Sequence, residues 1–256
     1  MAKQRSAVSG ERTRSAGVDS QIARAFIGLR EMLLHGELGR GERISELPLV
    51  ARLGTSRTPI RLALERLAHI GMLDVLPGGG FTVRGFTLAE ALDAIELRGV
   101  LEGTAARFAA ERLRDESELD GLRHACTQME ALDGLTIDTF AIYMDLNESF
   151  HSGFVELAKS EMLRRALEQV SSLPFASASA MVFPTSVLPN ADANLVIAND
   201  HHRSIVEAIA QRQGARAESV AREHAYVARR VLGVAMSDTD ALSRIPGGPL
   251  IHLSAP

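Results

Sequence analysis

The chain contains few of the residues that mark secreted, membrane or strand-rich proteins. Its single cysteine, Cys126, has no second cysteine for a disulfide, which fits the reducing cytoplasm. There is no tryptophan and only two tyrosines, whereas Ala, Leu, Arg and Glu are abundant and favour helix. No apolar run is long enough to span a bilayer, and the N-terminus lacks the apolar core of a signal peptide. We therefore expect a mainly helical, cytoplasmic protein that does not enter a membrane.

The chain as a whole has a small excess of negative charge, but its N-terminal third is basic. The formal net charge of the 256 residues is −4. Residues 1–85 carry thirteen Lys and Arg against eight Asp and Glu, a net charge of +5, which leaves −9 for the remainder. A basic first third followed by an acidic remainder is typical of a nucleic-acid-binding module joined to a module with another task.

The stretch from Leu53 to Leu67 predicts the turn and second helix of a helix-turn-helix. Gly54 suits the left-handed conformation that ends a preceding helix, and the Ser56 hydroxyl can cap the next one. Pro59 falls in the first turn, where its missing N–H is not needed. Three apolar residues follow on one face at helical spacing: Ile60, Leu64 and Leu67.

Two arginines at the start of this helix are candidates for DNA contacts. Arg57 and Arg61 are four residues apart and share a face that differs from the apolar one. In a helix-turn-helix the start of the second helix enters the major groove, where an arginine can bind phosphate or contact guanine with two hydrogen bonds. The alternative interpretation is an ordinary amphipathic helix with solvated surface arginines.

The flanking residues predict a winged helix-turn-helix over residues 19–85. Apolar residues at helical spacing indicate a first helix that begins at Asp19 or Ser20 and ends at Gly36. A short helix over residues 45–52 follows. Two strand-like runs then flank a glycine-rich tip at residues 77–80, which predicts a β-hairpin. Residues 1–18 are rich in Ser, Arg and Gly, and we expect them to form a disordered basic tail.

The rest of the chain predicts an all-helical bundle over residues 86–236. Thr87 and Glu90 form a capping box that opens a long helix to about Leu113. Further helices are expected over residues 117–132, 138–159, 161–180 and 215–236, with one or two more before residue 213. Residues 237–256, with the sequence Pro-Gly-Gly-Pro at 246–249, are expected to form a flexible tail. The predicted fold is mainly α, with one small β-hairpin.

Residues 20–85 closely resemble the DNA-binding module of the GntR family of bacterial transcription regulators. The match is carried by many positions in one register rather than by a single motif. These positions are Leu29-Arg-Glu31, Gly36-Glu-Leu38, Gly41-Glu-Arg-Ile-Ser-Glu46, Leu53-Gly54, Ser56-Arg-Thr-Pro-Ile-Arg61, Ala63-Leu64 and Gly71-Met-Leu73.

The second module resembles the FCD domain, the all-helical ligand domain of the FadR-type branch of that family. The matching residues are Glu96 to Glu102, Ala105-Ala106, Ala109-Ala110, Phe150-His151, His202 to Ile209, Ala217 and His224. Residues 43–110 are also similar to the vanillate-responsive repressor group.

The resemblance implies a homodimer that binds double-stranded DNA at an operator with two related half-sites. It also implies that Arg57 and Arg61 contact DNA, together with Thr58 and the wing tip at Gly78. Arg43 joins this set because it directly precedes the second helix.

Three histidines fall in the family pattern and predict a metal or ligand site. His151, His202 and His224 lie on different predicted helices, and Asn147 shares a helix face with His151. Converging neutral imidazoles with an oxygen donor suit a transition metal such as zinc, nickel or manganese. In the family the position of Asn147 is usually Asp, so we expect weaker metal binding here. The alternative for each histidine is a hydrogen-bonded polar residue of the core.

Two further features indicate a small-molecule effector. Arg98 either pairs with Glu102 four residues away or holds an effector carboxylate, since a buried arginine needs an anionic partner. The segment of small residues over 171–183 leaves room beside Phe175, Met181 and Phe183, which suits a flat aromatic acid. A packed helix–helix contact is the alternative interpretation. The expected effector-binding residues are Arg98, Asn147, His151, Phe175, His202 and His224.

The sequence therefore predicts a DNA-binding repressor that is released from its operator by a small carboxylic acid. One candidate for this effector is an aromatic acid. The alternative is a metal-dependent hydrolase that uses the histidines. Against the hydrolase, no Glu or Asp has the spacing of a general base beside the histidines, and there is no nucleophile elbow or phosphate loop.

Overall fold

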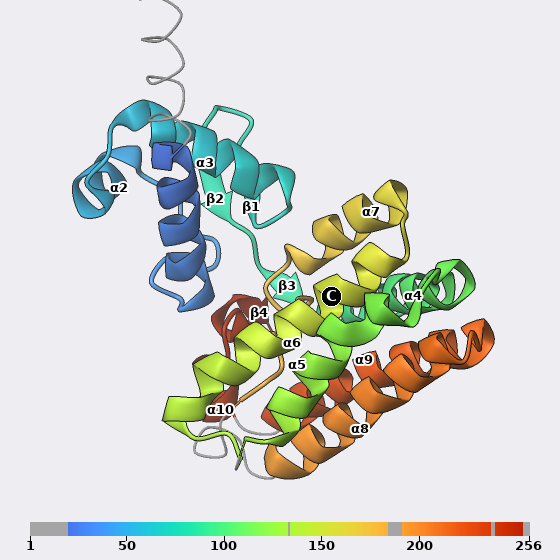
Figure 1. Cartoon of the computed structure of the whole chain (residues 1–256). Coiled ribbons are helices and arrows are strands. Elements are labelled where there is room, and N and C mark those ends of the chain that lie inside the picture. Colours follow the sequence, from blue (N-terminus) through green and yellow to red (C-terminus); the bar gives the residue numbers. More distant parts are fainter. Residues whose placement is uncertain (1–19, 133, 184–190, 237–238, 253–256) are drawn as a thin grey trace, which may run out of the picture. The chain divides into compact units, whose positions relative to one another are not determined.

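The computed structural model describes residues 20–132, 134–183, 191–236 and 239–252 (Figure 1). The chain divides into two compact units. The first runs to Phe86 and also includes Pro249–His252, and the second runs from Thr87 to Gly248. The expected basic tail at residues 1–18 lies outside the described residues. Within them, no helix is both long and apolar enough to cross a membrane.

The first unit contains three helices and a small hairpin, which confirms the predicted winged helix-turn-helix. A helix over residues 20–34 is followed by α2 (Glu46–Leu53) and α3 (Arg57–His69). The strands β1 (Leu73–Val75) and β2 (Phe81–Val83) pair antiparallel, with Leu73 opposite Val83 and Val75 opposite Phe81.

The turn between α2 and α3 has the predicted geometry, with one difference. Gly54 ends α2 in the left-handed conformation, with φ 60° and ψ 37°. Ser56 occupies the N-cap position of α3 in extended geometry, but its side chain makes no capping hydrogen bond. The expected apolar face of α3 is buried at Ile60, Leu64 and Leu67, so packing rather than capping orients this helix.

A segment before α2 adds a third, strand-like edge to the hairpin. Arg43 forms an antiparallel bridge with Thr82. The Gly41 amide donates to the Val83 carbonyl at 2.8 Å, and the Ile44 amide donates to the Phe81 carbonyl at 2.9 Å. These bonds fix the loop that carries Arg43 directly against β2.

The second unit is a bundle of helices, and it confirms the expected fold class. It comprises α4 (Leu88–Arg112), a 3₁₀ turn at Glu116–Leu119, α5 (Asp120–Glu130), α6 (Ile137–Leu157), α7 (Glu161–Ser171), α8 (Ala191–Ala210), α9 (Gly214–Met236) and α10 (Thr239–Arg244). The predicted capping box of Thr87 and Glu90 opens α4.

Two helix boundaries differ from those expected. The helix α6 begins at Ile137 because Thr136, rather than Asp138, accepts the capping hydrogen bond from the Thr139 amide. The helix α7 ends at Ser171 rather than near Ala180. Pro174 explains the early end, because it lacks an N–H and disfavours helical geometry at the preceding residue. Residues 172–181 form a series of turns instead.

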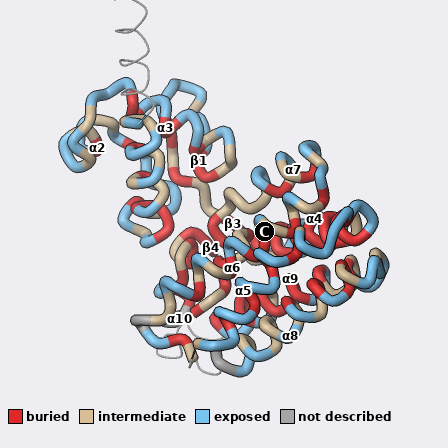
Figure 2. The backbone as a smooth tube through the Cα atoms, in the orientation of Figure 1, coloured by how far each residue is buried: buried red, intermediate tan, exposed pale blue. Residues whose placement is uncertain are grey.

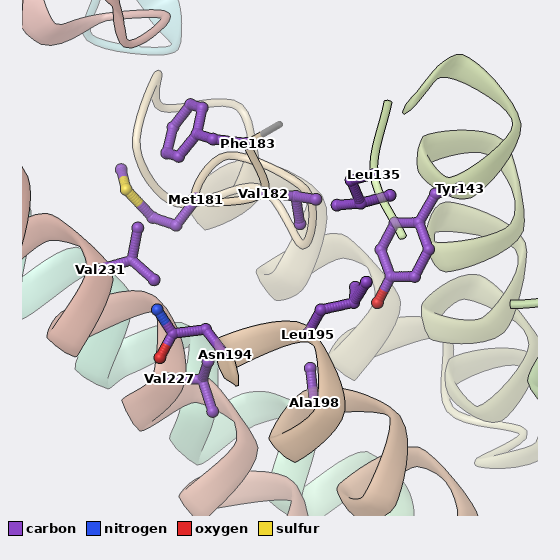
Figure 3. A pocket seen from close by; sticks show the side chains of 10 residues that line it. All are labelled: Leu135, Tyr143, Met181, Val182, Phe183, Asn194, Leu195, Ala198, Val227 and Val231. Atoms are coloured by element: carbon purple, nitrogen blue, oxygen red, sulfur yellow. The ribbon is translucent and has the colours of Figure 1, made fainter. Parts of the chain in front are cut away.

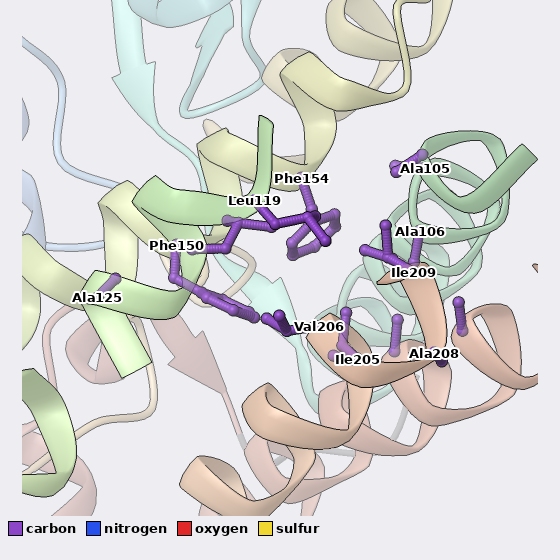
Figure 4. Packing of buried hydrophobic residues seen from close by; sticks show 14 of the residues in the cluster. Ala105, Ala106, Leu119, Ala125, Phe150, Phe154, Ile205, Val206, Ala208 and Ile209 are labelled. Atoms are coloured by element: carbon purple, nitrogen blue, oxygen red, sulfur yellow. The ribbon is translucent and has the colours of Figure 1, made fainter. Parts of the chain in front are cut away.

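Small residues on α4 allow neighbouring helices to approach closely. The helices of the bundle contain many buried stretches (Figure 2). Ala105 and Ala106 are fully buried in the core together with Phe150 and Phe154 of α6 (Figure 4), and Ala109 belongs to the same core. On the side of α4 that faces α9, a Cβ added to Gly99 would lie 2.8 Å from the Ala225 Cβ. One added to Gly103 would lie 2.9 Å from the Glu218 carbonyl oxygen. The two longest helices therefore pack at a distance that larger side chains would prevent.

The prediction of a flexible tail is wrong for residues 239–252. This segment forms α10, a 3₁₀ turn at Gly248–Leu250 and the strand β4 (Ile251–His252). The strand β4 pairs with β3 (Phe86–Thr87). Burial supplies the physical reason, because four apolar residues anchor the segment: Leu242, Ile245, Leu250 and Ile251.

Truncating Phe154 to alanine should destabilise the helical unit by about 3–5 kcal/mol, because it removes a fully buried ring and leaves a cavity. Ile142→Ala on the same helix is the matched control, since Ile142 is 52% exposed and should change stability by about 0.5 kcal/mol or less. Urea denaturation followed by circular dichroism measures both. A similar loss for the two variants would contradict the described core.

Candidate functional site

Three buried histidines from three helices meet inside the second unit. His151 lies on α6, His202 on α8 and His224 on α9. Each offers a ligand nitrogen within 4.8 Å of those of the other two. The Nε2 atoms of His202 and His224 are 3.3 Å apart, so that one ring can donate a hydrogen bond to the other. The structure thus brings together the histidines that the sequence singled out; we refer to them as the histidine cluster.

The histidine cluster fits a divalent transition metal. Two imidazole nitrogens that bind one tetrahedral zinc ion at about 2.0–2.1 Å lie about 3.3 Å apart, which matches the separation of His202 and His224. Burial lowers the pKa of both rings well below the usual value, and neighbouring histidines lower it further. Both rings are therefore neutral at pH 7, which is the form that coordinates metals. The buried Nε2 of His151 has no hydrogen-bond partner among the described residues and is free to act as a third ligand.

A buried carboxylate orients His151. The His151 Nδ1 donates to Glu102 Oε1 at 2.9 Å, which leaves Nε2 for the histidine cluster. Arg98, four residues before Glu102 on α4, places its Nε 3.6 Å from Glu102 Oε2 and is 1% exposed. Burial alone would raise the pKa of Glu102, but His151 and Arg98 outweigh burial and hold this pKa below its usual value. Glu102 is therefore ionised at pH 7.

Asn147 and Arg98 both bind the turns that follow α7. The Asn147 Nδ2 donates to Ser179 Oγ at 2.9 Å, and both side chains are buried. Arg98 donates to the Ser177 carbonyl oxygen. Of the two interpretations of Arg98 that the sequence left open, the structure contains the pair with Glu102. Asn147 and Arg98 therefore hold residues 172–183 in place, and we refer to this segment as the wall because part of it lines a cavity.

A cavity of about 40 Å³ is lined by residues of α6, α8, α9 and the segment after α7 (Figure 3). Several of these residues lie about one helical turn from residues of the polar site. Tyr143 precedes Asn147 by four residues on α6, Ala198 precedes His202 by four on α8, and Val227 follows His224 by three on α9. Other lining residues come from the wall at 172–183 and from α8 and α9; among them are Met181, Val182, Phe183, Leu195 and Val231.

The lining of this cavity differs in part from the apolar walls expected from the sequence. Met181 and Phe183 line it, whereas Phe175 is 1% exposed and is not among the lining residues. With room for about three waters, the cavity accepts a small alkyl group, but an aromatic ring would require side chains to move.

The residues expected to contact DNA lie on the surface of the first unit. Arg57, Thr58 and Arg61 occupy the first two turns of α3 and are exposed. Arg61 Nε is 3.4 Å from Glu65 Oε1, an exposed pair that phosphate can replace. Gly78 is exposed at the tip of the hairpin, and Arg43 is exposed on the segment paired with β2.

A surface groove separates α3 from the hairpin. Arg61, His69, Gly79 and Gly80 are among the residues that line it. The start of α3 and the hairpin tip therefore border one exposed surface, the arrangement by which a winged helix-turn-helix reads DNA.

Sequence reasoning missed two contacts of the site. Glu102 was considered only as a helical neighbour of Arg98, whereas it also orients His151 from another helix. The other is made by His201, which sequence reasoning did not include in the site and whose ring lies 6.0 Å from that of His224 at an angle of 78°. The burial of both Arg98 and Glu102 distinguishes their pair from a surface pair, and it follows only from the tertiary packing of α4.

A winged DNA-binding unit joined to a helical unit with a buried polar site defines a transcriptional regulator. Residues 21–83 match the family described as bacterial regulatory proteins, gntR family, and residues 93–226 match the FCD domain. The chain therefore belongs to the GntR family, in the branch that carries an FCD domain. The family and the named relatives are transcriptional regulators rather than enzymes, which removes the hydrolase alternative.

The named relatives of this chain are also described as transcriptional regulators or repressors. The chain is 34% identical over 131 residues to the Nta operon transcriptional regulator of Aminobacter aminovorans, a match of 51% of this chain and 60% of that protein. It is 31% identical over 193 residues to the "Probable D-xylose utilization operon transcriptional repressor" of Paenarthrobacter nicotinovorans, covering 75% of this chain and 78% of that one. The first of these matches thus spans less than two thirds of the relative.

A solved structure supports the fold alone. E. coli McbR/YncC aligns with a TM-score of 0.59 at 19% identity, over 85% of this chain and 97% of that one.

Replacing Glu102 by glutamine should lower the free energy of unfolding by about 3–5 kcal/mol, because Arg98 then stays buried without an anionic partner. The matched control is Glu111→Gln, which removes the carboxylate from the exposed pair with Arg107 at the same spacing on α4 and should cost about 1 kcal/mol or less. Urea denaturation compares the two. Equal losses would mean that the buried network contributes no more than a surface pair.

Proposed function

We propose that the protein is a homodimeric repressor that leaves its operator when a small organic acid binds in the helical unit. The observation that supports this most directly is the buried histidine cluster. It lies in a unit separate from the DNA-binding unit, beside a cavity, and includes polar atoms that have no partner among the described residues. Such atoms are costly to bury unless a ligand or ion uses them.

The charges of the site favour an anionic ligand. His202 and His224 are neutral at pH 7 because burial holds the pKa of both rings well below its usual value, Asn147 carries no charge, and the negative charge of Glu102 is offset by Arg98. A divalent ion held by the histidine cluster and Asn147 would therefore add positive charge to the site and, when bound, would supply an electrophilic partner for a carboxylate. We place the carboxylate of the effector at the histidine cluster and assign Arg98 to holding Glu102 and the turns at 172–183.

The cavity limits the rest of the effector. Its volume of about 40 Å³ suits an acid with a short alkyl substituent. If the protein belongs to the vanillate-responsive group, an aromatic ring must enter this cavity. Displacement of the flexible Met181 side chain would make room for the ring. Both kinds of acid therefore belong in the test.

Release from DNA requires that the acid prefer one arrangement of the dimer. An effector lowers operator affinity only if it binds more tightly to the arrangement that does not fit two half-sites. The test is fluorescence anisotropy of the full chain on DNA from upstream of its own gene, titrated with vanillate and with short-chain carboxylic acids, with and without zinc. Release by one acid supports the proposal, whereas binding that no acid changes assigns the cavity a purely structural role.

In the same assay, Arg61→Ala should weaken DNA binding about ten-fold or more, because Arg61 is exposed on the second turn of α3. The matched control, Arg165→Ala, removes an equally exposed arginine from α7 of the helical unit and should leave DNA binding unchanged. Binding of the releasing acid, followed through the melting temperature, should be the same in both variants. Loss of acid binding in Arg61→Ala would contradict the separation of the two functions.

Asn147→Asp should raise zinc affinity at least about ten-fold, because an anionic oxygen then replaces a neutral amide beside the histidine cluster. Competition with a coloured chelator measures the affinity. Asn199→Asp introduces the same charge on α8, where Asn199 accepts a hydrogen bond from Tyr143, and should change zinc affinity less. Equal affinities for Asn147→Asp and the unmodified chain would exclude residue 147 from the metal site.

A further inference from the structure

The C-terminal segment of the chain is part of the DNA-binding unit. After α10 the chain returns to that unit, and residues 249–252 belong to it. The strand β4 pairs with β3, and Leu250 and Ile251 are buried. A Cβ added to Gly36 would lie 2.8 Å from the Pro249 Cβ, so the segment packs directly against the turn that ends the first helix. We call residues 249–252 the C-terminal strap.

The C-terminal strap also contacts the loop that carries Arg43. Arg40 Nη1 donates to the Ile251 carbonyl oxygen at 3.3 Å. Arg40 also packs on Gly85, because a Cβ added there would lie 3.1 Å from the Arg40 Cδ. The next residue, Gly41, donates from its amide to the Val83 carbonyl of β2. A continuous set of contacts thus runs from the strap through Arg40 to the base of the hairpin.

We propose that the C-terminal strap positions the DNA-contacting loop and hairpin. By holding Arg40 from one side, the strap fixes residues 39–44 against β2, and this sets the place of Arg43 relative to the hairpin tip. Arg40 and Ile251 are then positioning residues, which act on DNA binding without touching DNA. The role rests on the established family function of DNA binding and is independent of the identity of the effector.

The C-terminal strap also forms a second covalent connection between the DNA-binding unit and the helical unit. Within the described part of the chain, the DNA-binding unit is joined to the helical unit at two places, Phe86–Thr87 and Gly248–Pro249. The second connection leads back through α10 to α9, the helix that carries His224. A shift of α9 can therefore reach Arg43 and the hairpin through the strap, in addition to the direct linker between the units.

The test compares two shortened chains that contain both units, one ending at Gly248 and one ending at His252, which differ only in the C-terminal strap. We expect the shorter chain to bind DNA from upstream of its own gene about ten-fold more weakly. Amide hydrogen exchange at residues 41, 44 and 83 should be faster, with exchange in α6 and α9 unchanged. Unchanged exchange at these three amides, or unchanged DNA binding despite faster exchange, would overturn the proposal.

A point variant tests the same proposal in case the shortened chain does not fold. Arg40→Ala should weaken DNA binding about five-fold, the value of one hydrogen bond, and Arg40→Lys should restore part of it. Arg24→Ala removes the same charge from an exposed position of the first helix, so it reports the purely electrostatic loss. Exchange at residues 41, 44 and 83 should rise in Arg40→Ala only. Equal effects of the two alanine variants on affinity and exchange would mean that Arg40 acts through its charge alone.

Discussion

The helical unit depends on one buried charge, the carboxylate of Glu102. A charge so fully removed from water needs partners, and Glu102 finds them in Arg98 on its own helix and His151 on α6. This requirement orients the His151 ring and holds the Arg98 guanidinium inward, where it binds the Ser177 carbonyl. A single ionised group therefore fixes one histidine of the cluster and the wall of the neighbouring cavity.

The helix α4, which carries Arg98 and Glu102, also determines where His224 lies. The side of α4 that carries Gly99 and Gly103 allows α9 to approach within contact distance at Ala225 and Glu218, on either side of His224 in sequence. Glycine costs helix stability, and the close contact with α9 offsets that cost by burying apolar surface. The long helix α4 thus places two of the three histidines, one through charge and one through shape.

Local patterns predicted most of the fold but only part of the site. Gly54 and the Thr87–Glu90 capping box act within a few residues, so the sequence was sufficient to predict them. The resemblance to the FCD domain, rather than spacing along the chain, predicted that the three histidines converge, and they do. The order of residues 239–252 escaped prediction because it depends on burial against distant parts of the chain, and Pro-Gly-Gly-Pro is typical of loops. The link from Glu102 to His151 likewise joins residues 49 positions apart, which no local pattern reveals.

The unpartnered polar atoms connect stability with regulation. Among the described residues, the Nδ1 atoms of His202 and His224 and the Nε2 of His151 are buried without hydrogen bonds. Each such atom costs about 1–3 kcal/mol, a substantial share of the stability of a typical domain. An ion held by the Nε2 atoms of the histidine cluster gives the Nε2 of His151 a partner and recovers that part of the free energy, and the stabilisation of the bound form grows with the logarithm of the ion concentration. Because α9 carries His224 and continues toward α10 and the strap, a change that satisfies the histidines acts on an element with a direct covalent route to the DNA-binding unit. Under the proposed function, regulation by a ligand requires that the liganded and unliganded forms of the protein differ in their affinity for DNA.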